Sequence, residues 1–295
     1  MKLITWNTQW CCGTDGVVSP ERIVVEARAM ADFDVLCLQE ISQGFDGLPG
    51  EPGDQPAQLQ ALLPGYQVFF GAAVDGFGTR GQRQRFGNLI ATRLPVVNVQ
   101  HYPLPWPADP SVPSMARMCS SVTIVDPVLG TLRVMTTHLE YYSAGQRMAQ
   151  TCALRELQAQ ACTLALQPPK PENETTPFRC VPHTTQALLC GDFNFEPGAP
   201  EYAAIQEPFW ATAQSEHVVA AIENGSYRWH DAWRVCHNLM PHAPTFRLYD
   251  RLYGPQPITC DYVWISDALA ARRSTLSVNA DSRASDHQPL LLELT

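Results

Sequence analysis

The sequence predicts an α/β fold in which mixed β-sheets lie between helices, within one domain that spans residues 1–295. Short apolar, strand-like runs alternate with segments of helical periodicity. Several of these runs are continuously apolar, which is typical of strands covered on both faces. Too many of them follow one another as hairpin-like pairs for a purely parallel sheet. Neither an internal repeat nor a change in composition marks a second domain.

At the start of the chain, two strands flank a capped helix. Leu3–Asn7 has the pattern of a first strand. A helix is expected over Pro20–Met30, because Ser19 can cap it, its first residue is a proline, and apolar residues recur on one face. The apolar run 34–41 contains Glu40 near its end and predicts a second strand covered on both faces.

The remaining elements follow from periodicity and from turn residues. The longest helical pattern spans residues 143–166, and the proline-rich segment that follows ends it. Short helices are expected near residues 57–63 and from residue 200 onward. Further strands are expected at residues 66–70, 88–92, 120–125, 132–137, 188–190, 260–265 and 290–294.

Composition argues against several classes of protein. With 45% hydrophobic and 17% charged residues, the chain is globular rather than disordered. No apolar run reaches transmembrane length and no signal-peptide pattern opens the sequence, so we expect a cytoplasmic location and no membrane span. A net charge of -9 disfavours an unaided grip on long duplex DNA and suits a site that concentrates divalent cations.

The ten cysteines do not indicate a disulfide framework. Cys37, Cys190 and Cys260 lie inside apolar runs, where cysteine behaves as a small hydrophobic residue. The sequence has no Cys-x-x-Cys pair, which argues against a zinc site of that type.

Polar residues stand where predicted strands end, which is where ligands bind in open α/β sheets. One carboxylate in such a place is usually a cap or turn residue, but six aligned cases favour a shared site. The residues concerned are Asn7, Glu40, His138, Asp192 with Asn194, Asp261, and Asp286 with His287.

The carboxylates and amides suit metal-assisted hydrolysis of a phosphate ester. This reaction requires stabilisation of charge on phosphate oxygens and an activated water molecule. Glu40 and Asp286 offer oxygen ligands to a hard cation, Mg²⁺ or Mn²⁺. Asp192 and Asn194 are two positions apart, so both side chains lie on one face of an extended chain. One can accept a proton from water while the other orients that water or a phosphate oxygen.

The histidines complete this chemistry. His138 and His287 can donate hydrogen bonds to phosphate oxygens, and a neighbouring carboxylate can keep an imidazole charged. Asp261 is the candidate for that role beside His287.

In this order the motifs resemble the endonuclease/exonuclease/phosphatase superfamily, which has the deoxyribonuclease I-like fold. The resemblance implies a four-layer α/β sandwich, in which two packed mixed β-sheets are flanked by helices. The matching segments run across nearly the whole chain: residues 5–7, 38–40, 87–95, 137–140, 191–194, 260–263 and 285–287.

The resemblance also implies roles for these residues. Mg²⁺ or Mn²⁺ would be held mainly by Glu40, with Asn7 and Asp286 nearby. The attacking water would be handled by Asp192 and Asn194, and the phosphate by the Asp261–His287 pair and His138, with Asn88 as a further substrate-binding residue. Gln9 stands where many members have an acid, which leaves the number of metal ions open. The segment Glu140-Tyr141-Tyr142 differs from that of abasic-site endonucleases.

Weaker signals concern loops and tryptophans. The motif at residues 76–81 has dinucleotide-binding spacing but leads into a strand, so we interpret it as a mobile loop. Arg80, with Arg83 and Arg85, makes this loop either a solvated segment or a lid that contacts substrate phosphate. We expect Arg251 or His242 to touch the leaving group. Trp6 and Trp10 are expected in the core.

The sequence thus predicts a divalent-metal-dependent phosphoesterase in which Asp192 activates water. A nuclease or other phosphodiesterase is favoured over a phosphatase or phosphodiesterase of sugar, inositol or sphingolipid phosphates. A third hypothesis is a catalytically inactive binding module, which the presence of the whole polar set disfavours. The expected partner is a phosphate ester, a class that includes nucleic acids, and no obligate protein partner is evident.

Overall fold

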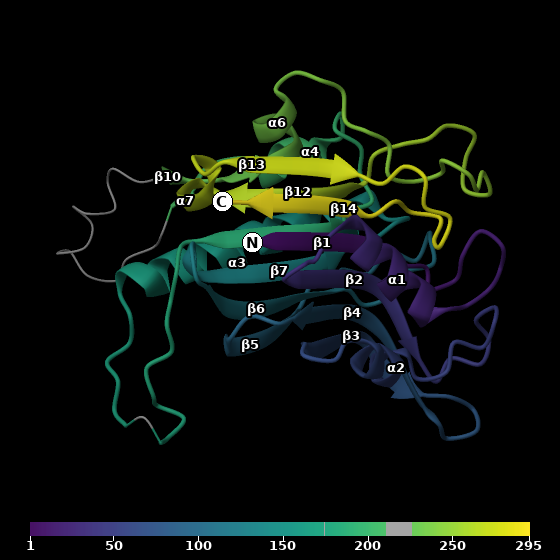
Figure 1. Ribbon diagram of the computed structural model, residues 1–295, viewed down its shortest axis with the longest axis horizontal. Coiled ribbons are helices and arrows are strands. Elements are labelled where there is room, and N and C mark those ends of the chain that lie inside the picture. Colours follow the sequence, from purple (N-terminus) through teal and green to yellow (C-terminus); the bar gives the residue numbers. More distant parts are fainter. Residues whose placement is uncertain (174, 211–225) are drawn as a thin grey trace.

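The computed structural model describes residues 1–173, 175–210 and 226–295, and two six-stranded β-sheets form its centre (Figure 1). The strands of the first sheet are β1 (Lys2–Asn7), β2 (Val35–Gln43), β3 (Gln67–Phe77), β4 (Arg83–Thr92), β13 (Ser274–Val278) and β14 (Leu290–Leu294). Those of the second are β5 (Val96–Pro103), β6 (Met118–Asp126), β7 (Gly130–His138), β8 (Ala187–Asp192), β11 (Trp229–Asp231) and β12 (Asp261–Ser266). The helices are α1 (Pro20–Met30), α2 (Gln55–Leu62), α3 (Ala144–Leu166), α4 (Pro200–Ile205), α6 (Ala232–His237) and α7 (Asp267–Ala270).

Both sheets are mixed, as the sequence predicts. The first has the order β13-β14-β1-β2-β4-β3, and β1 is parallel to β2 but antiparallel to β14. The second has the order β11-β12-β8-β7-β6-β5, in which β7 and β8 are parallel and the other pairs antiparallel. A separate two-stranded sheet joins β9 (Phe209–Trp210) and β10 (Ser226–Tyr227).

Three apolar clusters show how the layers stack. Alternate residues of a strand face opposite sides of its sheet, so Leu3 packs between the two sheets while Ile4 packs outward. The outer cluster of the first sheet includes residues of α1 and α2, such as Ile23 and Leu59. The outer cluster of the second sheet includes Leu154 of α3. Helix, sheet, sheet and helix therefore form the expected four-layer sandwich. We propose that the described residues are one domain, because the cluster between the sheets draws on strands from both ends of the chain.

Helix boundaries follow the local sequence signals. The helix predicted over Pro20–Met30 is present, and Ser19 Oγ accepts a hydrogen bond from the Arg22 backbone N–H at 3.1 Å. Ser143 caps α3 in the same way through Gln146. None of the helices in the described part of the chain combines the length and apolarity needed to cross a bilayer.

The prediction of a loop at residues 76–81, with Arg80, Arg83 and Arg85 as its basic residues, was wrong in extent. Strands β3 and β4 continue to Phe77 and Arg83, so residues 78–82 alone connect them as a hairpin. The extension was not expected because this part of the hairpin is polar. The Arg83 side chain of β4 makes a diagonal ion pair with Asp75 of β3, and Asp75 lies opposite Arg85 in the register. Strands β5 and β13 were also not expected from the sequence.

Candidate active site

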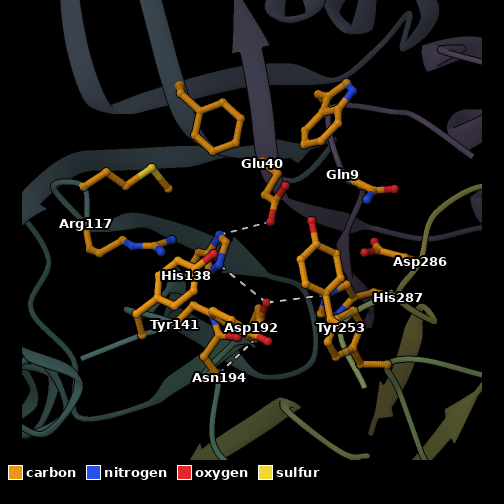
Figure 2. A pocket seen from close by; sticks show the side chains of 15 residues that line it. Gln9, Glu40, Arg117, His138, Tyr141, Asp192, Asn194, Tyr253, Asp286 and His287 are labelled. Carbon is orange, nitrogen blue, oxygen red and sulfur yellow. Dashed lines mark hydrogen bonds and ion pairs between the residues drawn. The ribbon is translucent and has the colours of Figure 1, made fainter. Parts of the chain in front are cut away.

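The predicted site residues gather where β1, β2, β7 and β8 end and just before β14 begins. Parallel pairing places Asn7 beside Gln39 and His138 beside Asp192, and Asp261 faces Asp192 from β12. A pocket of about 230 Å³ opens at this edge of the two sheets (Figure 2). Its lining comprises Gln9, Trp10, Glu40, Phe86, Met115, Arg117, His138, Tyr141, Tyr142, Asp192, Asn194, Phe246, Tyr253, Asp286 and His287.

Glu40 enters the pocket because β2 is irregular at this point. The pairing of β2 with β4 shifts register between Leu38 and Ile41, and Glu40 has a φ of 61°. A bulge of this kind turns a side chain away from its regular direction, and left-handed backbone in a non-glycine residue is strained. Asn7 Nδ2 donates to Glu40 Oε1 at 3.0 Å and so fixes the carboxylate.

Asp192 lies at the centre of the polar network and is 1% exposed. Its Oδ1 accepts the backbone N–H of Asn194 at 2.9 Å, and its Oδ2 accepts Asn7 Nδ2 at 2.9 Å. The same Oδ2 lies 3.5 Å from His138 Nε2 and 3.7 Å from His287 Nε2. The preceding Gly191 makes this placement possible, because a Cβ at that position would lie 2.0 Å from the backbone oxygen of Thr137.

His287 is held on one face and on one edge. Its Nδ1 lies 2.9 Å from Asp261 Oδ2, and its ring stacks on Phe246 with centroids 4.3 Å apart and planes 18° apart. Burial alone lowers the pKa of His287, but the charges of Asp261 and Asp192 outweigh it and raise the pKa to about 10. At neutral pH the ring is therefore an imidazolium, with Nε2–H free to point at Asp192 or at a substrate oxygen.

His138 has the opposite character. Burial, with the nearby charges of Arg117 and His287, lowers its pKa well below the ordinary value. Its Nδ1 lies 3.8 Å from Glu40 Oε1. At neutral pH this ring is uncharged and carries one N–H donor.

The pocket holds more negative than positive charge. Burial raises the pKa of Glu40, and it raises that of Asp286 to about 6. Within residues 1–173, 175–210 and 226–295, Arg117 is the one arginine or lysine that lines the pocket. Its Nε lies 3.3 Å from Glu140 Oε2 in a buried ion pair. The carboxylate oxygens of Glu40 and Asp286 are therefore not fully neutralised by protein cations. Such oxygen donors are the ligands that a hard divalent cation requires.

The protein comparisons agree with this geometry. The model of the Endonuclease/Exonuclease/phosphatase family matches residues 4–287. The chain belongs to this family. Its members hydrolyse phosphate esters, generally with a divalent metal ion. No curated protein matches the sequence significantly.

Solved structures of the family share the fold. A family protein from Beutenbergia cavernae is 25% identical, with a TM-score of 0.68 over all of this chain and 71% of the other. A mannosyl-6-phosphatase from Bacteroides thetaiotaomicron is 17% identical, with a TM-score of 0.66 over all of this chain and 99% of that one. The catalytic domain of human nocturnin is 18% identical, with a TM-score of 0.55 over all of this chain and 94% of its own.

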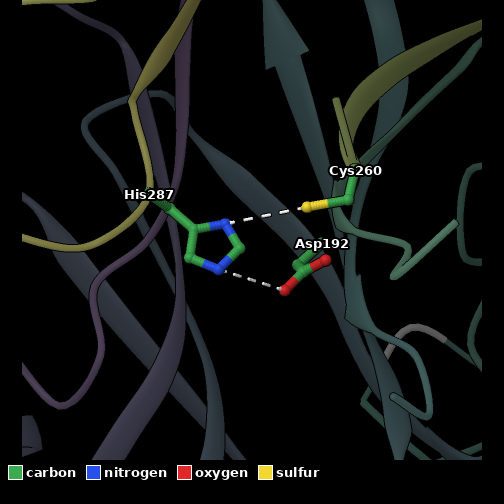
Figure 3. A group of neighbouring side chains, drawn as sticks. All are labelled: Asp192, Cys260 and His287. Atoms are coloured by element: carbon green, nitrogen blue, oxygen red, sulfur yellow. Dashed lines mark hydrogen bonds and ion pairs between the residues drawn. The ribbon is translucent and has the colours of Figure 1, made fainter. Parts of the chain in front are cut away.

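Asp192, Cys260 and His287 form another group that could hold an ion in this family member (Figure 3). One potential ligand atom from each lies within 4.8 Å of the others. However, Cys260 Sγ lies 4.0 Å from Nδ1 of His287, the nitrogen that Asp261 already engages, while Nε2 faces Asp192. Burial also raises the pKa of the Cys260 thiol well above its ordinary value, so the thiolate is disfavoured. Glu40 and Asp286, which line the pocket, fit a hard cation better.

Asn7 and Asp261, two of the predicted site residues, do not line the pocket but contact residues that do. Asn7 is fully buried, and its Nδ2 faces Glu40 and Asp192 while its Oδ1 accepts the backbone N–H of Gln9 at 3.1 Å. Asp261 reaches the pocket only through His287. In these contacts both residues position other side chains.

The predicted substrate-binding residues do not line the pocket. Arg80 bonds Asp46 and is 74% exposed, and exposed Arg251 donates to the backbone oxygens of Pro255 and Leu248. Buried Asn88 donates to the Met118 backbone oxygen at 3.1 Å. Their substrate-binding roles remain predictions. His242 lies in a different cluster, with Nε2 2.6 Å from Asp231 Oδ2.

Several lining residues were missed or misplaced by sequence reasoning. Trp6 is buried as expected, but the core prediction for Trp10 was wrong, because Trp10 is half-buried and lines the pocket. Arg117 and Tyr253 carried no motif. A basic residue at the start of an apolar strand was the signal available for Arg117.

Proposed function

We propose that this protein hydrolyses phosphate esters with the help of Mg²⁺ or Mn²⁺, and that Asp192 activates the attacking water. One observation supports this most strongly: Glu40, Asp192, Asp286, His138 and His287 line a single pocket although they come from four separate parts of the chain. Asp192 and Asp286 are buried and Glu40 is partly buried, and placing three carboxylates together in this way is costly, which argues against a scaffold without catalysis.

The cation would be held by Glu40 and Asp286. Asn7 stays a predicted ligand, but its amide nitrogen faces Glu40 and its amide oxygen accepts the Gln9 backbone N–H, so in this arrangement Asn7 would steady Glu40. When bound, it supplies charge stabilisation for the phosphate oxygens in the transition state. The excess negative charge of the pocket supports this assignment.

Asp192 is placed to take a proton from water. Burial raises the pKa of Asp192 above the ordinary aspartate value, which makes it a stronger base than a surface aspartate. Its orientation is fixed by Asn7 and by the backbone N–H of Asn194. The Asn194 amide, tied through Nδ2 to the Leu139 backbone oxygen at 2.9 Å, can present its own oxygen to the water.

The histidines would bind the phosphate. His287, kept protonated by Asp261, can donate Nε2–H to a phosphate oxygen and offset the developing charge. Neutral His138 can donate one further hydrogen bond. Because the leaving oxygen needs a proton at neutral pH, the imidazolium of His287 is also the best-placed acid in the pocket.

Phosphodiester cleavage and hydrolysis of a small organic phosphate both fit these roles, and the charges favour the small substrate. A polynucleotide presents a row of phosphates, which proteins neutralise with several cations. Arg117 is the sole arginine or lysine among the lining residues in the described part of the chain, and the whole chain carries a net charge of -9.

The test is turnover of p-nitrophenyl phosphate, bis-(p-nitrophenyl) phosphate and single- and double-stranded oligonucleotides with Mg²⁺ or Mn²⁺. Asp192→Asn should reduce kcat by about 100-fold or more. Asp281→Asn, at an exposed position outside the pocket, is the matched control and should act like wild type. Absence of turnover on every ester, or equal rates for wild type and Asp192→Asn, would reject the proposal. Steep loss of activity with rising salt would indicate a nucleic-acid substrate instead of a small one.

A further inference from the structure

Four aromatic side chains form a continuous wall on one side of the pocket. We call Tyr142, Tyr141, Tyr253 and Phe246, in this spatial order, the aromatic wall. Ring centroids are 4.8 Å apart for the first pair, 6.2 Å for the second and 6.1 Å for the third. The last ring, Phe246, stacks on His287 at 4.3 Å. The wall therefore runs from the rim of the pocket to a proposed catalytic imidazole, and Figure 2 shows Tyr141 and Tyr253 around Asp192.

The wall is accessible from outside the protein. Tyr141, Tyr142 and Tyr253 are 36%, 54% and 44% exposed. Within the described part of the chain, none of their three hydroxyl groups has a hydrogen-bond partner. Exposing three large rings side by side forgoes the stabilisation that burial would give, so such a surface marks a binding site.

The rest of the pocket is also apolar away from the hydrolytic residues. Trp10, Phe86 and Met115 complete the lining. The volume of about 230 Å³ is below the ~300 Å³ at which pockets for drug-sized ligands begin, so it suits one phosphate and one ring.

The charges of the lining agree with a single phosphate. Arg117 is 7% exposed, and its Nη1 has no hydrogen-bond partner although its Nε is paired with Glu140. One buried guanidinium nitrogen can satisfy one anionic oxygen. A second phosphate would find no further arginine or lysine among the described lining residues.

We infer that the substrate is an ester of a single phosphate that carries a flat aromatic ring, and that this ring lies against the aromatic wall. The ring belongs to an aryl or arylmethyl group, or to the base of a mononucleotide. The inference rests on the proposed function, because the phosphate must reach Asp192 and His287. Stacking on aromatic side chains depends little on which ring is stacked. The same aromatic wall can therefore bind either an aryl group or a nucleobase.

Other substituents fit less well. A long aliphatic chain needs a long groove, whereas this pocket is small. A sugar alone is recognised through many hydrogen bonds. Beyond the hydrolytic residues and Arg117, the described lining offers Gln9 and the tyrosine hydroxyls as further polar groups.

The experiment compares two esters that differ in aromaticity but hardly in size or leaving-group basicity. Benzyl phosphate and cyclohexylmethyl phosphate, each also as its methyl diester, are assayed with Mn²⁺ by release of alcohol. In whichever class the enzyme hydrolyses, monoester or methyl diester, we expect kcat/KM to be roughly tenfold higher for the benzyl compound than for the cyclohexylmethyl compound. Tyr253→Leu and Tyr141→Leu, at rim positions that can lose a ring without loss of the fold, should lower this ratio severalfold. Phe178→Leu, an aromatic residue that is 70% exposed and outside the pocket, should leave the ratio unchanged.

A second readout does not need turnover. Calorimetry with benzylphosphonate and cyclohexylmethylphosphonate, which cannot be hydrolysed, measures ring preference as affinity. If both esters are hydrolysed at equal rates and the two phosphonates bind with equal affinities, the inference that the aromatic wall binds a ring is rejected. The proposed phosphoesterase function is then still supported. Preference in binding without hydrolysis of any ester would support the ring site and reject the proposed function. Thymidine 5′-phosphate in both assays then distinguishes a nucleobase from a simple aryl group.

Discussion

Asp261 Oδ2 lies 2.9 Å from Nδ1 of His287, and both side chains are almost completely buried. This pair explains how an imidazole shielded from water keeps a proton. Without the carboxylate, burial would lower the pKa of His287, whereas the charges of Asp261 and Asp192 raise it to about 10.

The pair gives a prediction about pH. If protonated His287 is required, the alkaline decline of wild-type activity should begin only as the pH rises toward about 10, because a raised pKa keeps the ring charged below that value. Asp261→Asn removes the raising charge, so the alkaline decline should move to lower pH and kcat/KM at neutral pH should fall by about 100-fold. The measurement is kcat/KM against pH at saturating Mg²⁺. An unchanged alkaline limb with normal activity would show that Asp261 does not control the charge of His287.

Glu40 should stabilise the metal-bound protein and destabilise the metal-free one. Burial raises the pKa of this carboxyl group, so its ionised form is unfavourable without a cation. In EDTA, Glu40→Gln should therefore raise the free energy of unfolding by about 1 kcal/mol. In millimolar Mn²⁺ the wild type should gain stability that the variant lacks. Urea unfolding under both conditions measures this, with Glu21→Gln on the exposed side of α1 as control. Equal Mn²⁺ effects in the variant and the wild type would contradict Glu40 as a ligand.

Replacing only one partner of the buried Arg117–Glu140 ion pair should lower the free energy of unfolding. Glu140 is fully buried, and its Oε1 also accepts the Tyr142 backbone N–H at 2.9 Å. Arg117→Met leaves this carboxylate without its cation and should lower the free energy of unfolding by about 3 kcal/mol. Adding Glu140→Gln should recover much of that loss, because glutamine keeps the hydrogen bond without the charge. A double-mutant cycle in urea measures the coupling, and strictly additive losses would show that the pair is not coupled.

Thiol reactivity should follow burial. All ten cysteines are free, and Cys152 and Cys180 are exposed while Cys236 is partly buried. The native protein should show two fast-reacting thiols with Ellman's reagent, and ten after denaturation without reductant. Fewer than ten in the denatured protein would reveal a disulfide. A fully reduced count agrees with the cytoplasmic location, which stays a prediction.

The polar residues at the strand ends were predictable because each of them lies close, in the sequence, to the apolar run that forms the strand. A continuous apolar run shows where a strand lies, and the polar residue that follows shows where it ends, as for Leu188–Cys190 and Asp192. Pairing of these strands into two sheets was not derivable from periodicity, because it depends on contacts such as Asn7 with Asp192, 185 positions apart. The family resemblance supplied that information.

The loop residues were not predictable in the same way. Arg80 has the composition of a phosphate-binding loop, but Asp46 engages it, and nothing in the local sequence shows that contact. Conversely, Tyr253 belongs to no motif and reaches the pocket because its segment folds back, with the Arg247 guanidinium donating to the Tyr253 backbone oxygen at 2.8 Å. Long-range contacts decide which loop side chains meet a ligand.

The pairing of β1 with β14 has a consequence for biosynthesis. The first strand lies in the middle of its sheet, beside β14 near the other end of the chain (Figure 1), and Ser285 Oγ donates to the Asn7 backbone oxygen 278 positions away. A nascent polypeptide cannot complete this sheet until translation has passed residue 290, so β1 waits with an unpaired edge. Asp286 and His287, which line the pocket, lie just before β14, so the pocket is also incomplete until this last segment of the described chain has been made.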